Sequence, residues 1–451
     1  MLQEDLNTRY REETSAIKTP VDIDLEGQVA SAEIGYEINQ NWQIGGQYFF
    51  NTTRADILTR PETRISREND EDVTIITDGQ EPQHPRLHKV NLNSQINLDS
   101  LGKKVIINLD YLNNHNIKTF GPTKKSSQLE GSKIFTKQIC EKYNIPTAKF
   151  GIFKNINETN EFLKKTEMPI VIKADGLAAG KGVYICETLD EAQNATKDIF
   201  EGKFGLAKNI LVEEFLSGDE MSYFIISDGK TFKNFNTAQD HKRIFDGDKG
   251  KNTGGMGAYS PSGLINQNLR NKIINKIIKP TLKALSDMGE NYTGFLYAGL
   301  MIKNNEPYLI EYNVRMGDPE CQTILPLLNS DLLSLIQACC EQKLENQKLD
   351  WLNQKSLCVV LSSKGYPDKF ESNIEIKNLD TLETNLKNYV FHAGTKNINK
   401  IVYSNGGRVL NFVSVSNEYK DSRHKALEMI NKLNWSNGYY RKDIGYKIID
   451  Q

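Results

Sequence analysis

The sequence predicts an α+β protein with an antiparallel, β-rich segment at its front and a mixed α/β module at its end. Apolar and polar residues alternate with a period of two over much of residues 1–116. Short strands and amphipathic helices alternate from Gly202 onward. A lighter mixture of strands and one helix then follows in residues 331–451. We therefore expect three domains, at residues 1–116, 117–330 and 331–451.

Length and composition narrow the class of protein further. The chain has 451 residues, and its 56 Lys and Arg against 58 Asp and Glu give a formal net charge of -2. This balance predicts no overall attraction to nucleic acid or to a membrane surface. No apolar run is long enough for a transmembrane helix, and the first residues lack the order of a signal peptide. Six cysteines without CxxC spacing predict reduced, mostly buried thiols in a cytoplasmic protein.

Two antiparallel hairpins are predicted in the first 116 residues. The first spans Ala32–Tyr48 with a break at Asn39–Asn41, and the second spans Val90–Tyr111. The polar stretch Asn51–Pro85 contains three prolines and predicts a long loop between the hairpins. Hairpins with aromatic ends and a long connection weakly resemble a fragment of an outer-membrane β-barrel. A small soluble meander fits the same pattern equally well.

Helical periodicity returns after residue 117. Helices are expected at Ser126–Tyr143, 157–166, around 269–278, at Leu332–Cys340 and near 422–433. Pro280 should break or kink the third of these helices. Strands are expected at 357–361 and 408–413.

A lysine–glycine loop is the first of four motifs that could carry chemistry. An apolar run leads to Lys173, a glycine-rich turn follows, and Lys181 precedes another strand-like run. Glycines let backbone N–H groups approach an anion, and two ammonium groups can hold phosphate oxygens. The loop is not a P-loop, since Gly176 and Gly180 enclose only three residues and Gly182 follows the second lysine. A plain tight turn between two strands is the alternative.

The second motif is an acidic strand end. Glu213 and Glu214 close an apolar run, Phe215 and Leu216 form a short link, and Glu220 follows. Such a segment can present backbone groups to a purine edge and a carboxylate to ribose hydroxyls. The alternative is an ordinary strand followed by a solvated acidic turn.

The third motif combines basic side chains with a loop dense in glycine. Residues 239–243 read Gln-Asp-His-Lys-Arg, and residues 252–257 read Asn-Thr-Gly-Gly-Met-Gly. Clustered cations beside such a loop suit a small anionic substrate. A flexible, solvated loop is the alternative.

The fourth motif places Glu311, Asn313 and Arg315 at every second position of an expected strand, so that all three share one face. Two oxygen donors two residues apart suit Mg²⁺, which takes its other ligands from phosphate and water. Arg315 on the same face could hold a carboxylate or an acyl phosphate. The alternative is a polar, solvent-facing strand.

Taken in order, these motifs resemble the phosphoribosylamine–glycine ligases, which are ATP-grasp enzymes of purine biosynthesis. The matching segments include Lys-Ala-Asp-Gly-Leu-Ala-Ala-Gly-Lys-Gly-Val, Val-Glu-Glu-Phe-Leu, Gln-Asp-His-Lys-Arg, Asn-Thr-Gly-Gly-Met-Gly and Glu-Tyr-Asn-Val-Arg-Met-Gly-Asp-Pro-Glu. The resemblance begins near Ile117 and continues to the end of the chain. So many motifs in uninterrupted order are far more specific than a lone glycine-rich loop.

The resemblance implies an ATP-grasp fold and a ligation in two steps. ATP would phosphorylate glycine, and 5-phosphoribosylamine would then attack the acyl phosphate. The resemblance also implies Mg²⁺ or Mn²⁺ as the cofactor and a monomeric enzyme. The ATP-binding positions by the family pattern are Lys137, Lys173, Gly180, Lys181, Gly182, Glu213, Glu214, Phe215, Leu216 and Glu220. The metal ligands match Glu311 and Asn313, the catalytic residues match Arg315, Asp318, Asp240 and Lys242, and the substrate-lining residues match Arg243, Gly254, Gly255, Met256 and Gly257.

The sequence of the N-terminal residues 1–116 departs from the pattern of this family. The family opens with a dinucleotide-fold-like domain that carries Gly-Arg-Glu-His-Ala and helps to hold phosphoribosylamine, and residues 1–116 contain no such pattern. The hypothesis is a chimera that joins a barrel fragment to a truncated ligase near residue 116. The alternatives are an inactive or altered ATP-grasp carboxylate–amine ligase and a non-catalytic nucleotide-binding protein.

Overall fold

The structure is a computed structural model that describes residues 118–176, 182–203 and 209–449, and the backbone of six strands between residues 22 and 91. The chain forms two compact units, Met1–Ile107 and Asn108–Gln451. Gly180 and Lys181 of the predicted phosphate loop, and the predicted strand that ends at Tyr111, lie outside the described residues.

The first unit contains two antiparallel sheets. They are formed by β1 (Asp22–Glu26), β2 (Val29–Asn39), β3 (Trp42–Asn51) and β6 (His88–Asn91) in the order β1-β2-β3-β6, and by β4 (Glu62–Glu68) with β5 (Asp72–Asp78). The predicted first hairpin is confirmed as β2–β3. The prediction of a long loop at Asn51–Pro85 is wrong, because β4 and β5 lie within it. The three prolines flank this pair instead of interrupting it, and the period-two pattern is obscured because Ile65 is the single apolar residue of β4.

The second unit begins with two short helices where the sequence predicts a single one. They are α3 (Gln128–Gly131) and α4 (Lys133–Lys142). Ser132 separates them, because its backbone is extended and its hydroxyl accepts a hydrogen bond from Phe135 N as the N-cap of α4. The next predicted helix is confirmed as α5 (Ile156–Leu163), which Asn155 caps in the same way.

A four-stranded antiparallel sheet carries the lysine motif. Its strands are β7 (Phe150–Phe153), β10 (Ile210–Glu214), β8 (Ile170–Ala174) and β9 (Val183–Cys186), in that order. Ile170, Ile172 and Val212 pack in one core with buried residues of α5 and α6 (Leu189–Phe200). Since side chains alternate across a strand, Lys173 and Glu213 project from the opposite face. The core of this sheet therefore orients the polar pair away from the helices.

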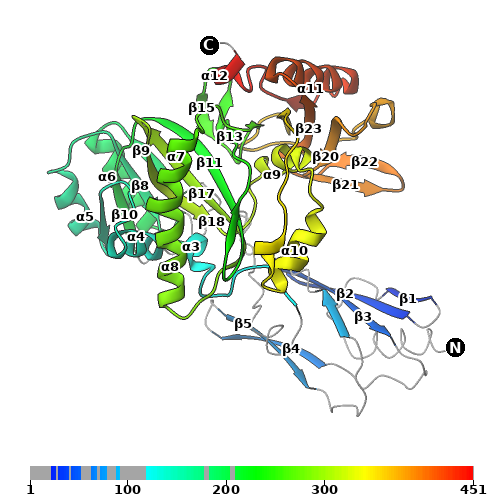
Figure 1. The fold of residues 1–451 in the computed structure, drawn as a ribbon, viewed down its shortest axis with the longest axis horizontal. Coiled ribbons are helices and arrows are strands. Elements are labelled where there is room, and N and C mark those ends of the chain that lie inside the picture. Colours follow the sequence, from blue (N-terminus) through cyan, green and yellow to red (C-terminus); the bar gives the residue numbers. More distant parts are fainter. Residues whose placement is uncertain are drawn as a thin grey trace. The chain divides into compact units, whose positions relative to one another are not determined.

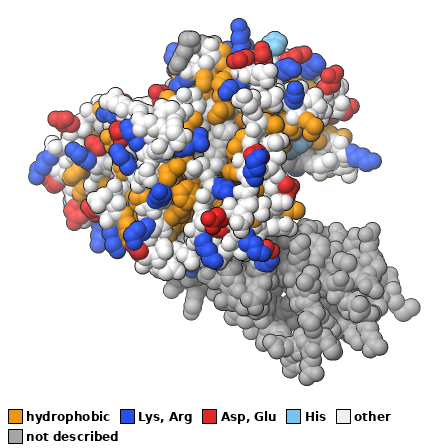
Figure 2. All heavy atoms as spheres, in the orientation of Figure 1, with side chains coloured by type: hydrophobic (Ala, Val, Ile, Leu, Met, Phe, Trp, Pro, Cys, Tyr) orange, Lys and Arg blue, Asp and Glu red, His pale blue; other side chains and the backbone are white. Residues whose placement is uncertain are grey.

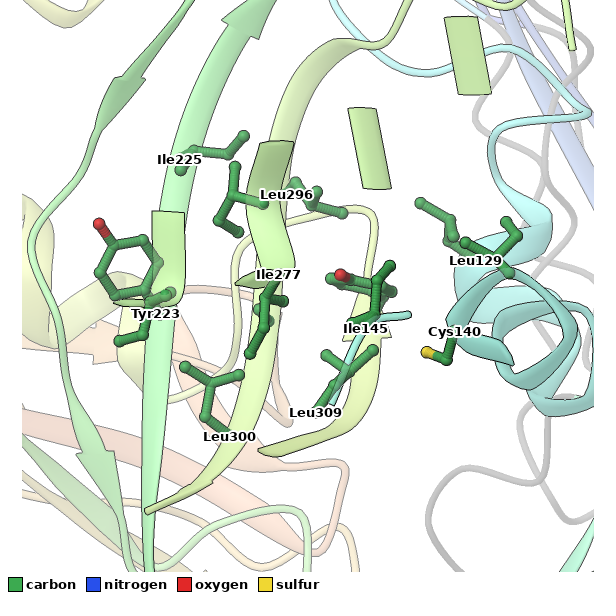
Figure 3. Packing of buried hydrophobic residues seen from close by; sticks show 14 of the residues in the cluster. Leu129, Cys140, Ile145, Tyr223, Ile225, Ile277, Leu296, Leu300 and Leu309 are labelled. Carbon is green, nitrogen blue, oxygen red and sulfur yellow. The ribbon is translucent and has the colours of Figure 1, made fainter. Parts of the chain in front are cut away.

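A second four-stranded sheet, with the order β12-β11-β17-β18, lies behind a long helical segment (Figure 1). Its strands are β12 (Phe232–Asn234), β11 (Asp219–Asp228), β17 (Thr293–Lys303) and β18 (Glu306–Asn313). Tyr223, Leu296 and Leu309 of these strands form one buried cluster with Ile277 and with Leu129 of α3 (Figure 3). This cluster fixes the strand that carries the predicted metal ligands.

The helical segment over this sheet consists of α7 (Gln267–Ile273), the π-helical turn Ile274–Ile278 and α8 (Lys279–Asp287). The predicted disturbance at Pro280 is confirmed as this π turn. Proline lacks an N–H and its ring crowds the carbonyl four residues earlier, so the helix widens by one residue ahead of it.

A third sheet crosses the predicted domain boundary at residue 330. Its order is β13-β16-β19-β23-β20, formed by β13 (Gln239–Asp240), β16 (Gly257–Ser260), β19 (Lys355–Ser363), β23 (Arg408–Ser416) and β20 (Asn388–His392), with β24 (Gly438–Tyr439) on β19. Helix α11 (Tyr419–Leu433) packs on one face. The sheet joins β13, which carries Asp240, and β16, which begins at Gly257, to strands of the predicted third domain, whereas the boundaries of the three domains stay a prediction.

The remaining elements are short or connect the sheets. They are β14 (Arg243–Phe245) with β15 (Lys249–Asn252), β21 (Thr395–Ile398) with β22 (Ile401–Ser404), α9 (Glu320–Ile324), α10 (Leu332–Cys340) and α12 (Tyr446–Ile449). All six cysteines are free and four of them are buried, as predicted. Acidic and basic side chains are interspersed over the face shown in Figure 2. In the described part of the chain, every helix is too short or too polar to cross a membrane.

Candidate active site

Two buried lysines share one carboxylate between the sheet β7-β10-β8-β9 and the sheet β12-β11-β17-β18. Lys173 Nζ lies 2.8 Å from Glu213 Oε2, and Lys137 Nζ of α4 lies 3.2 Å from Glu213 Oε1. Burial alone would raise the pKa of Glu213, but the two ammonium groups outweigh it and hold that pKa below its ordinary value. Burial lowers the pKa of Lys137. The structure thus brings together the two lysines that the sequence assigns to ATP, with Glu213 as their common counter-ion.

The segment around the lysine loop is held from α4. Asp175, just after β8, accepts hydrogen bonds from Ser132 Oγ at 3.1 Å and from Ile134 N at 3.2 Å. Lys133 Nζ donates to Gly176 O at 2.8 Å. Burial lowers the pKa of Lys133, and the neighbouring Glu311 carboxylate partly opposes that shift. Lys133 is therefore a third cation close to the predicted metal ligand, and the sequence reasoning gave it no role.

The predicted adenine segment emerges from the end of β10. Glu214 is exposed, and its carboxylate accepts a hydrogen bond from Lys149 N at 2.9 Å, which ties the segment to β7. Phe215 is 40% exposed and Leu216 is half-buried. An exposed aromatic ring can contact a flat base. Gly182 is buried at the start of β9, where its carbonyl accepts from Ala174 N.

Lys242 pairs with Glu220, the predicted ribose carboxylate, and lines one cavity with Glu311, the predicted metal ligand. Its Nζ donates to Glu220 Oε2 at 2.7 Å, and this ammonium lowers the pKa of Glu220. Burial would lower the pKa of Lys242, but Glu220, Glu311 and Asp240 raise it well above its ordinary value. These groups line one small cavity together with Ser222 of β11 and Tyr297 of β17. The cavity therefore gathers residues that the sequence assigns to three different roles.

Asp240, which is half-buried, stands beside a buried acid, Glu320 of α9. Burial, followed by repulsion from Glu320, raises the pKa of Asp240 well above its ordinary value. Its Oδ1 is buried and has no hydrogen-bond partner among the described residues. Glu320 is 3% exposed and accepts from Ser222 Oγ, which lies 2.9 Å from the hydroxyl of Tyr297. The sequence reasoning missed Glu320, although it ends the matching Gly-Asp-Pro-Glu segment.

The glycine loop packs tightly against Asp240. Gly255 has a φ of +110°, and a Cβ there would lie 2.7 Å from Asp240 Oδ1 and 2.6 Å from Pro319 Cδ. Only glycine fits such a position without strain. Met256, predicted to line the substrate, is fully buried in the core of the third sheet, whereas Gly257 opens β16. Gly254 of this loop is exposed, Gly255 is buried against Asp240, and Met256 anchors the loop.

Arg408 of β23 connects this loop to Asp318. Its Nη1 donates to both Gly254 O and Asp318 O at 2.6 Å, and its Nη2 lies 3.2 Å from Asp318 Oδ2. Gln322 Nε2 donates to the other carboxylate oxygen of Asp318 at 2.9 Å. The sequence reasoning gave Arg408 no role, although the family resemblance extends through residues 405–409, which read Asn-Gly-Gly-Arg-Val.

Glu311 and Asn313 lie two residues apart near the end of β18, and both are half-buried. The expectation that Arg315 shares their strand is wrong, because β18 ends at Asn313. Glu130 Oε2 accepts the hydrogen bond of Val314 N at 2.9 Å, which diverts the chain from strand pairing. Glu130 Oε1 pairs with Arg315, whose Nη2 also donates to Asn313 Oδ1 at 3.3 Å. Arg315 nevertheless reaches the predicted metal ligand.

Arg243 donates to Gly250 O at 2.7 Å, within the β14–β15 hairpin. The base of this hairpin is fixed by Arg441, which is fully buried and pairs with Asp248 at 2.7 Å and with Asp443 at 2.8 Å. His241 lies under the same network, and its Nε2 accepts from Gly445 N at 2.9 Å. The C-terminal residues thus hold the segment that carries Asp240 and Lys242.

The two sheets with buried lysines and acids between them define an ATP-grasp ligase, and the comparisons agree. Models of the phosphoribosylglycinamide synthetase ATP-grasp (A) domain and C domain match residues 131–321 and 356–447. The chain belongs to the phosphoribosylamine–glycine ligase family. It is 42% identical to the Brucella melitensis phosphoribosylamine–glycine ligase over 76% of this chain and 80% of that protein. The Arabidopsis thaliana chloroplastic ligase is 44% identical over 74% of this chain and 64% of its own length.

Solved structures show the same fold. The crystal structure of phosphoribosylamine–glycine ligase from Thermotoga maritima has a TM-score of 0.67 and 35% identity, and the match covers 72% of this chain and 81% of that one. The biotin carboxylase domain of the Hydrogenobacter thermophilus 2-oxoglutarate carboxylase has a TM-score of 0.57 at 16% identity, with 73% and 72% of the chains covered. The second likeness concerns the fold alone. The predicted family and ATP-grasp fold are therefore confirmed.

Proposed function

We propose that this chain joins glycine to 5-phosphoribosylamine with ATP, by way of a glycyl phosphate, and releases glycinamide ribonucleotide, ADP and phosphate. One observation of the site carries the proposal. Lys242 lies between Glu220, which the sequence assigns to ATP, and Asp240, which adjoins the glycine loop. Nucleotide-side and substrate-side groups therefore meet at one cavity. The named relatives supply the identity of the two substrates.

In the first step, a glycine carboxylate oxygen attacks the γ-phosphorus of ATP, and ADP leaves with the bridging oxygen. Lys137 and Lys173 would neutralise phosphate oxygens there, in place of part of their contact with Glu213. The exposed ring of Phe215 would contact the adenine, and Glu220 would accept from the ribose. Arg315 would hold the glycine carboxylate.

A divalent cation, Mg²⁺ or Mn²⁺, would be held by Glu311 and Asn313. Two half-buried oxygen donors at alternate positions of one strand fit such an ion, whose remaining ligands would be phosphate and water. Groups of three or more metal-binding His, Cys, Asp or Glu side chains do not occur in the described residues. The cation would supply charge neutralisation at the phosphates.

In the second step, the phosphoribosylamine nitrogen attacks the acyl carbon, phosphate leaves, and the nitrogen loses a proton. Asp240 would take that proton, because its Oδ1 is buried and unpartnered among the described residues, and a raised pKa makes its carboxylate a stronger base than an ordinary aspartate. The backbone of Gly254 and Gly255 would approach the substrate from the loop that Arg408 holds.

Release of ADP by the purified full chain, with each substrate omitted in turn, tests the proposal. We expect turnover only when ATP, a divalent cation, glycine and freshly generated phosphoribosylamine are all present. ADP release without phosphoribosylamine would indicate an altered ligase, and ATP binding without any turnover would indicate an inactive one. The monomeric state stays a prediction. The cytoplasmic location also stays a prediction, since the similar Arabidopsis protein is described as chloroplastic.

A further inference from the structure

We propose that Glu130 is the positioning residue that aims Arg315 into the site. This inference rests on the proposed function, in which Arg315 holds the glycine carboxylate. Glu130 lies on α3, 185 positions away from Arg315 in the sequence, and the four motifs that define the site do not include it.

Both oxygens of Glu130 are used on the segment that follows β18. Oε1 accepts from Arg315 Nε at 3.0 Å and lies 2.9 Å from Arg315 Nη2, whereas Oε2 accepts from Val314 N at 2.9 Å. The side chain of Glu130 is 17% exposed and that of Arg315 is 50% exposed. One carboxylate therefore fixes both the backbone that leaves the strand and the guanidinium that follows it.

The orientation of Arg315 matters because its planar guanidinium has a second edge that can hold a ligand. With Nε and one side of Nη2 turned toward Glu130, Nη2 points to Asn313 Oδ1 at 3.3 Å and Nη1 to Met316 O at 3.1 Å. An arginine presents a planar fork, so holding one edge fixes the direction of the other. Arg315 is thereby kept beside a predicted metal ligand, where the carboxylate to be phosphorylated must lie.

Glu130→Gln is the informative variant. Glutamine keeps one oxygen for Val314 N, so the backbone stays held, but it removes the charge that pairs with the guanidinium. Glu306→Gln is the matched control, because Glu306 is also ion-paired, with Lys272 and Lys276, at the start of β18 and away from Arg315. Kinetics in glycine and in ATP would be compared with solvent exchange of the Arg315 Nε–H, measured by ¹⁵N NMR and assigned with Arg315→Lys.

We expect kcat/KM for glycine to fall about 100-fold in Glu130→Gln, as for a misplaced substrate-binding group, with the KM for ATP and the Tm unchanged. Exchange of the Arg315 Nε–H should become faster, and Glu306→Gln should match the wild type in every readout. Unchanged exchange overturns the inference, as does normal glycine kinetics in an active chain. A wild type without turnover overturns the proposed function instead, and the exchange rates then decide alone whether Glu130 holds Arg315.

Discussion

Lys173 and Glu213 form an ion pair of 2.8 Å in which the two side chains expose only 7% and 5% of their surface. Each projects from its strand toward the face that the helices α5 and α6 leave free. The carboxylate also meets Lys137, so one negative charge faces two positive ones, and the excess positive charge suits phosphate oxygens. The pair therefore belongs both to the core of the fold and to the nucleotide site.

Replacing Glu213 by alanine should destabilise the protein by about 3–5 kcal/mol, because two buried ammonium groups lose their counter-ion. Urea denaturation at neutral pH measures this change. Asp287→Ala is the control, since its pair with Lys283 is exposed and contributes little. Equal shifts of the two denaturation midpoints would contradict the buried ion pair.

Gly255→Ala should lower both stability and turnover. The new Cβ would meet Asp240 and Pro319 at a φ of +110°, a combination that costs about 1–3 kcal/mol in backbone strain alone. Gly289→Ala separates the two causes, because Gly289 has a φ of +81° with open space around it. We expect the larger loss of Tm and any loss of kcat in Gly255→Ala. Identical thermal shifts, with activity retained in both variants, would show that the close packing at Asp240 is unimportant.

Local patterns predicted the elements that depend on local contacts. Helix α10 begins and ends where its periodicity indicates, because Asp331 caps its first turn and its apolar face is continuous. The strands around Lys173 and Glu311 follow the same logic. Ser132 escaped prediction because the apolar pattern continues through it, whereas its side chain starts a new helix.

Contacts between residues far apart in the sequence could not be predicted from local patterns. Arg408 lies 90 positions from Asp318 in the sequence, and neither periodicity nor spacing indicates that they meet. Glu320 and Glu130 lie in segments that matched the family, but their roles become visible only when α9 and α3 pack beside the strands. Sequence thus predicted which residue types the site needs, and tertiary packing determined which of them touch.

Acid should destabilise the protein through His241. This ring is 3% exposed, and burial lowers its pKa, so the unfolded chain takes up a proton that the folded chain excludes. The resulting stability is present above pH ~6.5, where the unfolded histidine is neutral, and is lost as the pH falls below that value. Unfolding free energies measured from pH 7.5 down to 5 check the sign.

His241→Gln should flatten this part of the pH profile, because glutamine keeps an acceptor for Gly445 N and takes up no proton. His424→Gln, on the exposed side of α11, should leave the slope as in the wild type. A wild-type slope that persists in His241→Gln would assign the acid sensitivity to other groups.

Arg408→Lys should lower kcat/KM for glycine by about 10- to 100-fold, because lysine cannot bridge Gly254 O, Asp318 O and the Asp318 carboxylate together. Steady-state kinetics with glycine varied at saturating ATP measure the effect. Lys251→Ala provides a comparison, since its ion pair with Asp368 is exposed. If Arg408→Lys and Lys251→Ala both keep wild-type kinetics, the link from β23 to the glycine loop does not serve the reaction.

Glu311→Ala should abolish turnover that depends on the divalent cation while leaving the fold intact. Removing one of two protein oxygens leaves Asn313 alone to hold the ion, and the half-buried position of Glu311 predicts little loss of packing. ADP release across a titration of Mg²⁺, together with the Tm, measures both expectations. Glu306→Ala lies on the same strand at its far end and should keep the wild-type Mg²⁺ dependence. Near-normal rates of Glu311→Ala at ordinary Mg²⁺ would remove Glu311 from the metal site and leave Asn313 without its partner.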